Sequence, residues 1–176
     1  MNYSGRENEM SILKIVSFPD PVLAKVGEPV VEFDDELKEL AEDMFETMYA
    51  AEGVGLAAQQ IGHALQLFVM DCEGTKIVAA NPEIIFKDGE QLGDEACLSL
   101  SSIGMPLNRA AVVRMRAQDI NGNFYEIEGT GLTARCLQHE TGHLNGHLFI
   151  EYLSPLKRDM LLKKFRKARK WEQAEM

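Results

Sequence analysis

Two histidines spaced four residues apart constrain this chain more than any other feature. His139 and His143 flank Glu140 in the run QHETGHLNG of residues 138–146, within a stretch of helical character from 129 to 144. Residues four apart share one face of a helix, so both imidazoles can reach one metal ion while Glu140 stands beside it as a proton carrier. The spacing predicts a metal-binding helix, although two surface histidines on a polar helix would show the same pattern.

Two histidines leave such a site short of ligands. A catalytic metal usually takes three ligands from the protein and keeps one position open. Cys136 lies three residues before His139 on nearly the same helix face, whereas Cys97 lies far away in the sequence. His147 continues the four-residue spacing, but Asn145-Gly146 predicts that the helix ends before it. Spacing alone does not choose between the two cysteines.

The remaining elements follow from the pattern of apolar residues. Residues 35–51 carry apolar side chains at helical spacing, with Asp34 as a candidate N-cap. Asn121-Gly122 predicts a hairpin, and Ser154-Pro155 predicts the start of a helix that runs to about residue 173. The candidate strands are residues 65–71, 77–80, 83–86, 111–117 and 124–128. A helix, several strands, a central helix and a terminal helix predict an α+β fold.

Composition excludes several classes of protein. The 176 residues include 18 basic and 28 acidic side chains, and the net charge of −10 argues against a chain built throughout to coat nucleic acid. No apolar run approaches the roughly 20 residues that span a bilayer. Three cysteines and no secretory leader predict a reducing compartment. The polar residues 1–10 are predicted to form a disordered extension.

The charge is distributed unevenly along the chain. Residues 157–176 carry eight basic and three acidic side chains, whereas residues 1–156 carry a net charge of −15. Leu161, Phe165, Ala168 and Trp171 form an apolar seam, which predicts that the last helix docks in part on the body. The basic side chains of this helix form either a solvated face or a surface for a partner. They are Lys157, Arg158, Lys163, Lys164, Arg166, Lys167, Arg169 and Lys170.

Three motifs resemble those of the peptide deformylase family, in that family's order and at its usual separations. They are GVGLAAQQ at residues 53–60, EACLS at 95–99 and QHETGHLNG at 138–146. The likeness runs from about Met10 to YLSPL at 152–156, so it covers nearly the whole chain. One motif would be a weak signal, but three in order are highly specific.

The resemblance implies a role for individual residues. The implied metal ligands are Cys97, His139 and His143. Glu140 would be the general acid and base, and the oxyanion donors would be the side-chain amide of Gln60 and the backbone N–H of Leu98. The residues implied to lie near the pocket for the substrate methionine are Gly53, Val54, Gly55, Glu95, Leu132 and Cys136.

The resemblance also implies a fold and a domain organisation. Antiparallel sheets would surround a central helix that carries the two histidines, with another helix at each end of the α+β domain. Residues 11–153 would form the catalytic domain, and residues 154–176 would form a basic helix packed on it.

The implied activity is hydrolytic and depends on a metal. The enzyme would remove the N-formyl group from the N-terminal formyl-methionine of newly made polypeptides and release formate. It would use one divalent ion per chain, with Fe²⁺ expected in the cell and Zn²⁺ or Ni²⁺ as alternatives, because a thiolate ligand suits these ions better than Mg²⁺ or Ca²⁺. The expected partners are nascent formyl-methionyl peptides and, through the basic helix, the ribosome; membranes and specific DNA are not expected. The expected location is the bacterial cytoplasm.

Four positions depart from the family's pattern. Ala96, Ser101, Gly104 and Gly142 stand where the family usually has glycine, proline, arginine and aspartate. A side chain at position 96 would be unfavourable if that position needs a positive φ. The departures motivate a second hypothesis, a catalytically weak deformylase-like protein that binds peptide. A third hypothesis is a zinc peptidase whose third ligand lies downstream of the helix.

Overall fold

The computed structural model describes residues 11–176, and the predicted disordered extension of residues 1–10 lies outside them. A five-stranded antiparallel sheet has the strand order β1-β2-β3-β6-β7. Its strands are β1 (Gly55–Ala57), β2 (Leu67–Cys72), β3 (Thr75–Asp88), β6 (Val112–Gln118) and β7 (Phe124–Thr130). A separate antiparallel pair comprises β4 (Gln91–Glu95) and β5 (Met105–Arg109).

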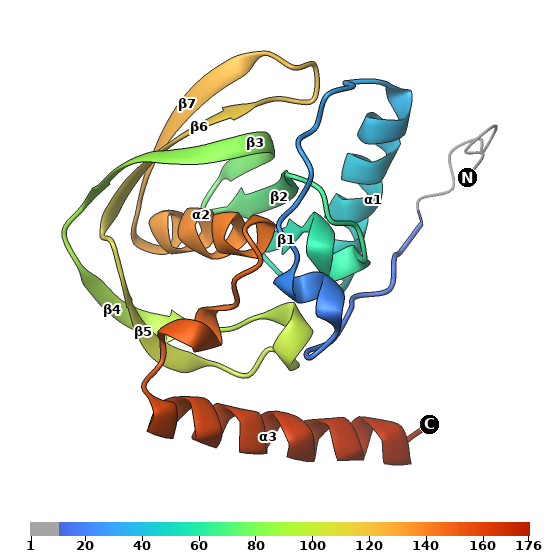
Figure 1. Ribbon diagram of the computed structural model, residues 1–176, viewed down its shortest axis with the longest axis vertical. Coiled ribbons are helices and arrows are strands. Elements are labelled where there is room, and N and C mark those ends of the chain that lie inside the picture. Colours follow the sequence, from blue (N-terminus) through green and yellow to red (C-terminus); the bar gives the residue numbers. More distant parts are fainter. Residues whose placement is uncertain (1–10) are drawn as a thin grey trace.

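Three α-helices complete the fold of the described part of the chain, which is α+β as predicted. They are α1 (Asp35–Ala50), α2 (Gly131–Leu144) and α3 (Pro155–Ala174). Figure 1 shows α2 in the middle of the molecule, with the large sheet curving around it and the β4–β5 pair below. Short 3₁₀ helices include η2 (Ala58–Ile61), η3 (Leu98–Leu100) and η4 (Phe149–Tyr152). The central position of α2 places its side chains inside the protein.

Helix α1 forms where the apolar spacing predicts it. The Asp34 side chain accepts a hydrogen bond of 3.0 Å from the Leu37 backbone N–H, as expected for an N-cap. The apolar stripe packs into a core formed with β1 and β2. Its buried side chains include Leu37, Ala41, Met44, Phe45 and Met48. This helix supports the sheet and lines no part of the site described below.

The strands differ from the sequence prediction in two ways. Residues 77–80 and 83–86 belong to one long strand, β3, so the prediction of two strands is wrong. Asn81-Pro82 lies at a shift of register between Ala80 and Glu83, where a proline without an N–H is tolerated. Strands β1, β4 and β5 were not predicted, because GLA, QLGDE and MPLNR contain no β-branched or aromatic residue.

Helix α2 is buried on nearly every side. Eleven of its 14 residues are buried, and many of these are polar. The helix ends at Leu144, where Asn145 is the C-cap and Gly146 has a φ of +79°. This confirms the predicted end before His147. A buried helix with polar side chains needs hydrogen-bonding partners from other elements.

Helix α3 docks through a shorter seam than the sequence predicts. Leu161 and Phe165 are buried in an apolar cluster that also contains Cys97, whereas Trp171 is 64% exposed. The prediction that part of the seam docks on the body is therefore confirmed for Leu161 and Phe165, while Trp171 lies outside the docked part. The C-terminal half of the helix, which Figure 1 shows along the lower edge of the molecule, contacts the body through a hydrogen bond of 2.8 Å from Arg169 to Ser17. Among the described residues no helix is both long and apolar enough to cross a bilayer.

Candidate metal centre

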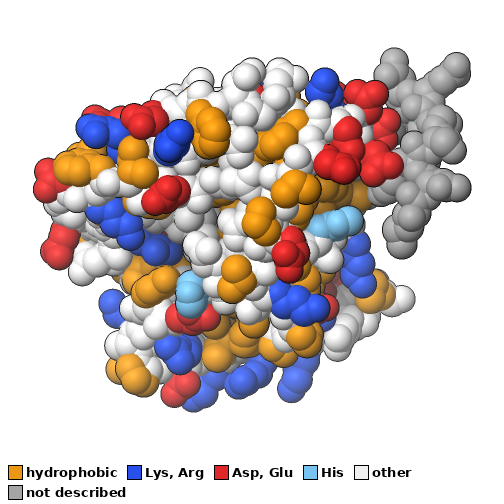
Figure 2. All heavy atoms as spheres, turned by 45° about the horizontal axis from the view of Figure 1, so that its top comes forward, with side chains coloured by type: hydrophobic (Ala, Val, Ile, Leu, Met, Phe, Trp, Pro, Cys, Tyr) orange, Lys and Arg blue, Asp and Glu red, His pale blue; other side chains and the backbone are white. Residues whose placement is uncertain are grey.

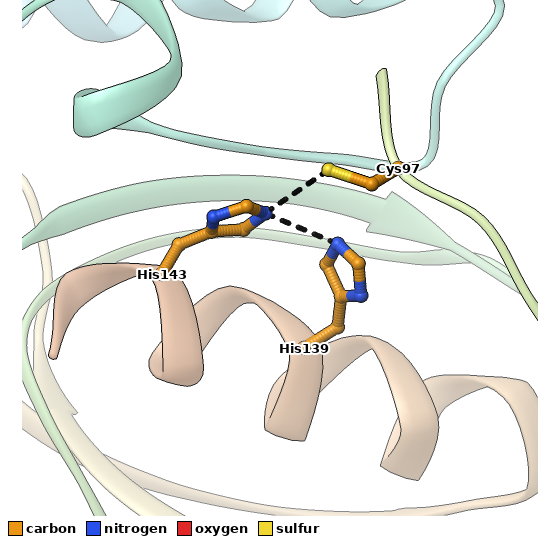
Figure 3. Close-up of side chains that lie close together, drawn as sticks. All are labelled: Cys97, His139 and His143. Carbon is orange, nitrogen blue, oxygen red and sulfur yellow. Dashed lines mark hydrogen bonds between the residues drawn. The ribbon is translucent and has the colours of Figure 1, made fainter. Parts of the chain in front are cut away.

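The side chain of Cys97, from the segment between β4 and η3, meets those of His139 and His143 on α2 (Figure 3). The Cys97 Sγ lies 3.4 Å from the His143 Nε2, which in turn lies 3.2 Å from the His139 Nε2. All three ligand atoms lie within 4.8 Å of one another, and all three side chains are buried. Tetrahedral bonds of about 2.1 Å to nitrogen and 2.3 Å to sulfur would separate such atoms by roughly 3.4–3.6 Å. The observed spacing therefore fits one divalent ion.

The rival ligands lie elsewhere. The Sγ of Cys136 faces the Val54 carbonyl oxygen at 4.0 Å, and burial raises the pKa of its thiol well above the usual value, which disfavours the thiolate. His147 pairs with Glu151 at 2.8 Å on the surface. Within residues 11–176, the group of Cys97 and the two α2 histidines is the one that satisfies the spacing of a metal site.

The first two sequence motifs meet at Gln60. Its side-chain oxygen accepts a hydrogen bond of 3.0 Å from the Ala57 backbone N–H, which turns the amide nitrogen toward the second motif. That nitrogen lies 3.5 Å from the Cys97 Sγ and 3.3 Å from the Ser99 Oγ. The Gln60 amide is thus a fixed donor next to the candidate metal ligands.

The carboxylate of Glu95 holds one of the two histidines. Its Oε2 contacts His139 Nδ1 at 2.8 Å and accepts a hydrogen bond of 2.7 Å from Arg109 Nη2. Its Oε1 accepts hydrogen bonds from Arg109 Nε at 3.0 Å and from Arg135 Nη1 at 3.1 Å. Burial alone would raise the pKa of Glu95, but the hydrogen bonds from His139 and Arg109 lower it to about 2. An ionised Glu95 accepts the proton on Nδ1, so Nε2 of His139 keeps its lone pair toward the candidate ion.

Glu140 is buried beside the ligands with an unused oxygen. Its Oε2 has no hydrogen-bond partner among residues 11–176, and burial raises the pKa of the carboxyl to about 7. A Cβ at Gly55 would lie 2.6 Å from the Glu140 Oε1, so this strand approaches the carboxyl closely only because position 55 is glycine. A carboxyl with a pKa near neutrality can both take up and release a proton.

A cleft of about 260 Å³ opens onto these groups. All six residues implied for the methionine pocket line it: Gly53, Val54, Gly55, Glu95, Leu132 and Cys136. Gln60, Leu98, Cys97, His139 and Glu140 line it as well. The structure therefore brings the sequence-predicted residues to one cleft, except that His143 is not among the lining residues and contacts Cys97 and His139, which are.

The departures from the motif pattern have a smaller structural effect than expected. Ala96 is absent from the described residues with positive φ, so the anticipated backbone cost at this position does not arise. In this segment the backbone instead adopts positive φ at Ser101 (52°) and Ser102 (55°), just after the 3₁₀ helix η3. A Cβ at Gly142 would meet only the His147 carbonyl oxygen, at an ordinary 3.8 Å.

Comparison with known proteins identifies the family. The description of the matching family is "Polypeptide deformylase", and the match spans residues 12–159. The chain belongs to this family. A peptide deformylase from Acidobacterium capsulatum is 48% identical over 163 residues, which cover 90% of this chain and 96% of that protein.

Solved structures of deformylases share the fold. The peptide deformylase from Legionella pneumophila is 46% identical and has a TM-score of 0.90, covering 93% of this chain and 98% of that chain. The enzyme from Ehrlichia chaffeensis in complex with actinonin is 38% identical with a TM-score of 0.86, covering 90% of this chain and 98% of that chain. The deformylase family thus accounts for the fold of this chain over nearly its whole length.

Two residues that contact Glu95 were missed by reasoning from the deformylase motifs. Arg109 lies at the end of β5, and Arg135 lies on α2 one turn before His139. The four-residue spacing of Arg135 and His139 was the available signal, because it places both side chains on one face of the helix. Arg109 had no such signal, since its contact depends on the β4–β5 pairing.

The pKa of Glu95 predicts how stability depends on pH. A carboxyl with a lowered pKa stabilises the folded protein above its unfolded-state pKa, near 4.5, and loses that contribution as the pH falls toward 2. We expect metal-free Glu95→Gln to be less stable than the parent protein by on the order of 3 kcal/mol at neutral pH, with the difference shrinking below about pH 4.5. Denaturant unfolding at several pH values measures this difference.

The matched control is Glu128→Gln. Glu128 pairs with Arg114 at 3.1 Å on the exposed face of β6 and β7, so its loss should cost about 1 kcal/mol or less. A difference between Glu95→Gln and the parent protein that stayed constant from pH 7 to pH 3 would contradict the assignment of an ionised, stabilising Glu95.

Proposed function

We propose that Cys97, His139 and His143 hold the ion with which this deformylase removes the N-formyl group from formyl-methionyl peptides. The observation that carries the proposal is the convergence of the three ligand atoms, two of which belong to residues that line the cleft. A divalent ion in this position lowers the pKa of a water molecule and polarises the formyl oxygen. One thiolate and two imidazoles suit Fe²⁺, Zn²⁺ or Ni²⁺, and we infer Fe²⁺ as the ion used in the cell.

Glu140 is the group that moves the proton. Its unpartnered Oε2 and a pKa near 7 suit it to take a proton from the attacking water. As the C–N bond of the formyl group breaks, the same carboxyl delivers that proton to the departing amine. The products are formate and a free N-terminal amine.

Two donors stabilise the charge that develops on the formyl oxygen. The Gln60 amide nitrogen is fixed by the hydrogen bond from Ala57 N–H to its own side-chain oxygen. The Leu98 backbone N–H belongs to the segment that follows Cys97 directly. Donors that are oriented before the reaction lower the barrier without reorganisation in the transition state.

The peptide substrate binds along the edge of the large sheet. Strand β1 is the edge strand of this sheet, and the residues that precede it, Gly53 and Val54, line the cleft. An extended peptide can add to such an edge through main-chain hydrogen bonds. The methionine side chain then enters the cleft between Leu132 and Cys136.

Helix α3 is the part of the chain that suits ribosome docking. Figure 2 shows Lys and Arg side chains gathered along the lower edge of the molecule, where α3 lies. The exposed ones are Lys157, Lys163, Lys164, Arg166, Lys167 and Lys170. Phosphate contacts would supply most of the affinity. An enzyme that acts on nascent chains at the ribosome would work in the bacterial cytoplasm, which is the location that we propose.

The first test measures formate release from formyl-Met-Ala-Ser. Glu140→Gln should lower kcat by at least about 10²-fold because the proton carrier is lost, while the metal content stays at one ion per chain. Glu128→Gln, which changes an exposed glutamate of β7, should match the parent protein. Equal background rates from the parent protein and Glu140→Gln would instead favour the hypothesis of a peptide-binding protein that does not turn over.

The second test concerns α3. Replacing Lys163, Lys164, Lys167 and Lys170 by glutamine should reduce co-sedimentation with ribosomes at low salt, and the parent protein should lose binding steeply as salt rises. The control carries four substitutions by glutamine at exposed lysines of the body: Lys14, Lys25, Lys38 and Lys87. Equal losses for both variants would show that α3 is not the docking surface.

A further inference from the structure

Arg135 is a buried cation in the wall of the active-site cleft. Its side chain is only 4% exposed, and it lines the cleft together with Glu95. Its Nη1 donates to the Glu95 Oε1 at 3.1 Å and to the Leu107 carbonyl oxygen at 2.9 Å, while its Nη2 donates to the Gln91 carbonyl oxygen at 3.4 Å. One guanidinium thus joins α2 to both strands of the β4–β5 pair and to Glu95.

The position of Arg135 depends on a missing side chain at Gly93. A Cβ at Gly93 would lie 3.1 Å from the Arg135 Nη2, closer than most such contacts. Gly93 belongs to β4, two residues before Glu95, so the same strand provides both the space and the acceptor for the guanidinium. A methyl group at Gly93 would therefore displace the guanidinium without removing its charge.

The second arginine on Glu95 has a different surrounding. Arg109 binds both oxygens of Glu95 and lies over the Tyr152 ring at 5.0 Å, but it is not among the residues that line the cleft. The two arginines therefore hold the same carboxylate from two sides, and only Arg135 also borders the substrate. Substituting Arg135 therefore changes the cleft wall directly, whereas substituting Arg109 acts only through Glu95.

We propose that Arg135 is a positioning residue that couples the wall of the substrate side-chain pocket to the metal ligand His139 through Glu95. The expected effect on substrate choice rests on the proposed function. The expected effect on His139 rests only on the contacts of Glu95. A shift of the guanidinium moves Glu95, and Glu95 holds Nδ1 of His139 at 2.8 Å. The same shift changes the shape of the cleft where the first side chain of the peptide binds.

The test uses two readouts on the metal-loaded protein. One is the rate of metal loss to a chelator, and the other is the ratio of kcat/KM for formyl-Phe-Ala-Ser to that for formyl-Met-Ala-Ser. Arg135→Met should accelerate metal loss by about 10-fold or more and change the substrate ratio. Arg109→Met, which acts on the cleft only through Glu95, should accelerate metal loss but change the ratio less than Arg135→Met does. Arg114→Met, at an exposed ion pair, should change neither.

The coupling itself is tested by Gly93→Ala. This substitution should accelerate metal loss several-fold in the parent protein but not in Arg135→Met, where no guanidinium remains to be displaced. Arg135→Lys keeps the charge but cannot reach all three acceptors, so it should rescue the metal-loss rate only in part. Circular dichroism and thermal melting establish that each variant folds. If Arg135→Met does not fold, Gly93→Ala is compared in the parent protein and in Arg135→Lys instead.

Two results would overturn the proposal. One is an effect of Gly93→Ala on metal loss that is equal in the parent and Arg135-substituted proteins. The other is a substrate ratio that Arg135→Met leaves unchanged. A parent protein that releases no formate would refute the proposed function instead, and the metal-loss measurements would still decide whether Arg135 positions His139.

Discussion

The buried carboxylate of Glu95 is the interaction on which the site depends. Helix α2 lies in the middle of the protein with polar side chains on it, and an unpaired buried charge would be costly there. Arg109, Arg135 and His139 supply four hydrogen-bonding contacts to the two oxygens of Glu95. These contacts keep Glu95 ionised, and an ionised Glu95 fixes which nitrogen of His139 faces the candidate ion.

The extended segment from Glu95 to Cys97 explains how one short motif serves this arrangement. Side chains alternate along an extended chain, so Glu95 and Cys97 point inward while Ala96 between them is exposed. The two inward-facing residues of this segment thus supply different parts of the site. Glu95 is the acceptor for His139, and Cys97 is the third ligand beside His143. The alternation also shows why alanine is accommodated at position 96, since this position is exposed and lines the open cleft.

The sequence predicted the elements whose signals are local. The apolar stripe of α1, the histidine pair on α2 and the Ser154-Pro155 start of α3 each depend on neighbours in the chain. Strands β4 and β5 could not be predicted this way, because their residues have low strand propensity and are held by pairing with each other. The network around Glu95 was hidden for the same reason, since Arg109 reaches Glu95 only across the β4–β5 pair. The choice of Cys97 over Cys136 required the family resemblance, and the fold places these two thiols in different surroundings.

X-ray absorption spectroscopy of the metal in anaerobically purified protein tests the central claim most directly. The account predicts one sulfur ligand at about 2.3 Å and two imidazole nitrogens at about 2.0–2.1 Å, with the sulfur signal lost in Cys97→Ser and retained in Cys136→Ser. A signal without sulfur, or one that disappears in Cys136→Ser alone, would contradict it.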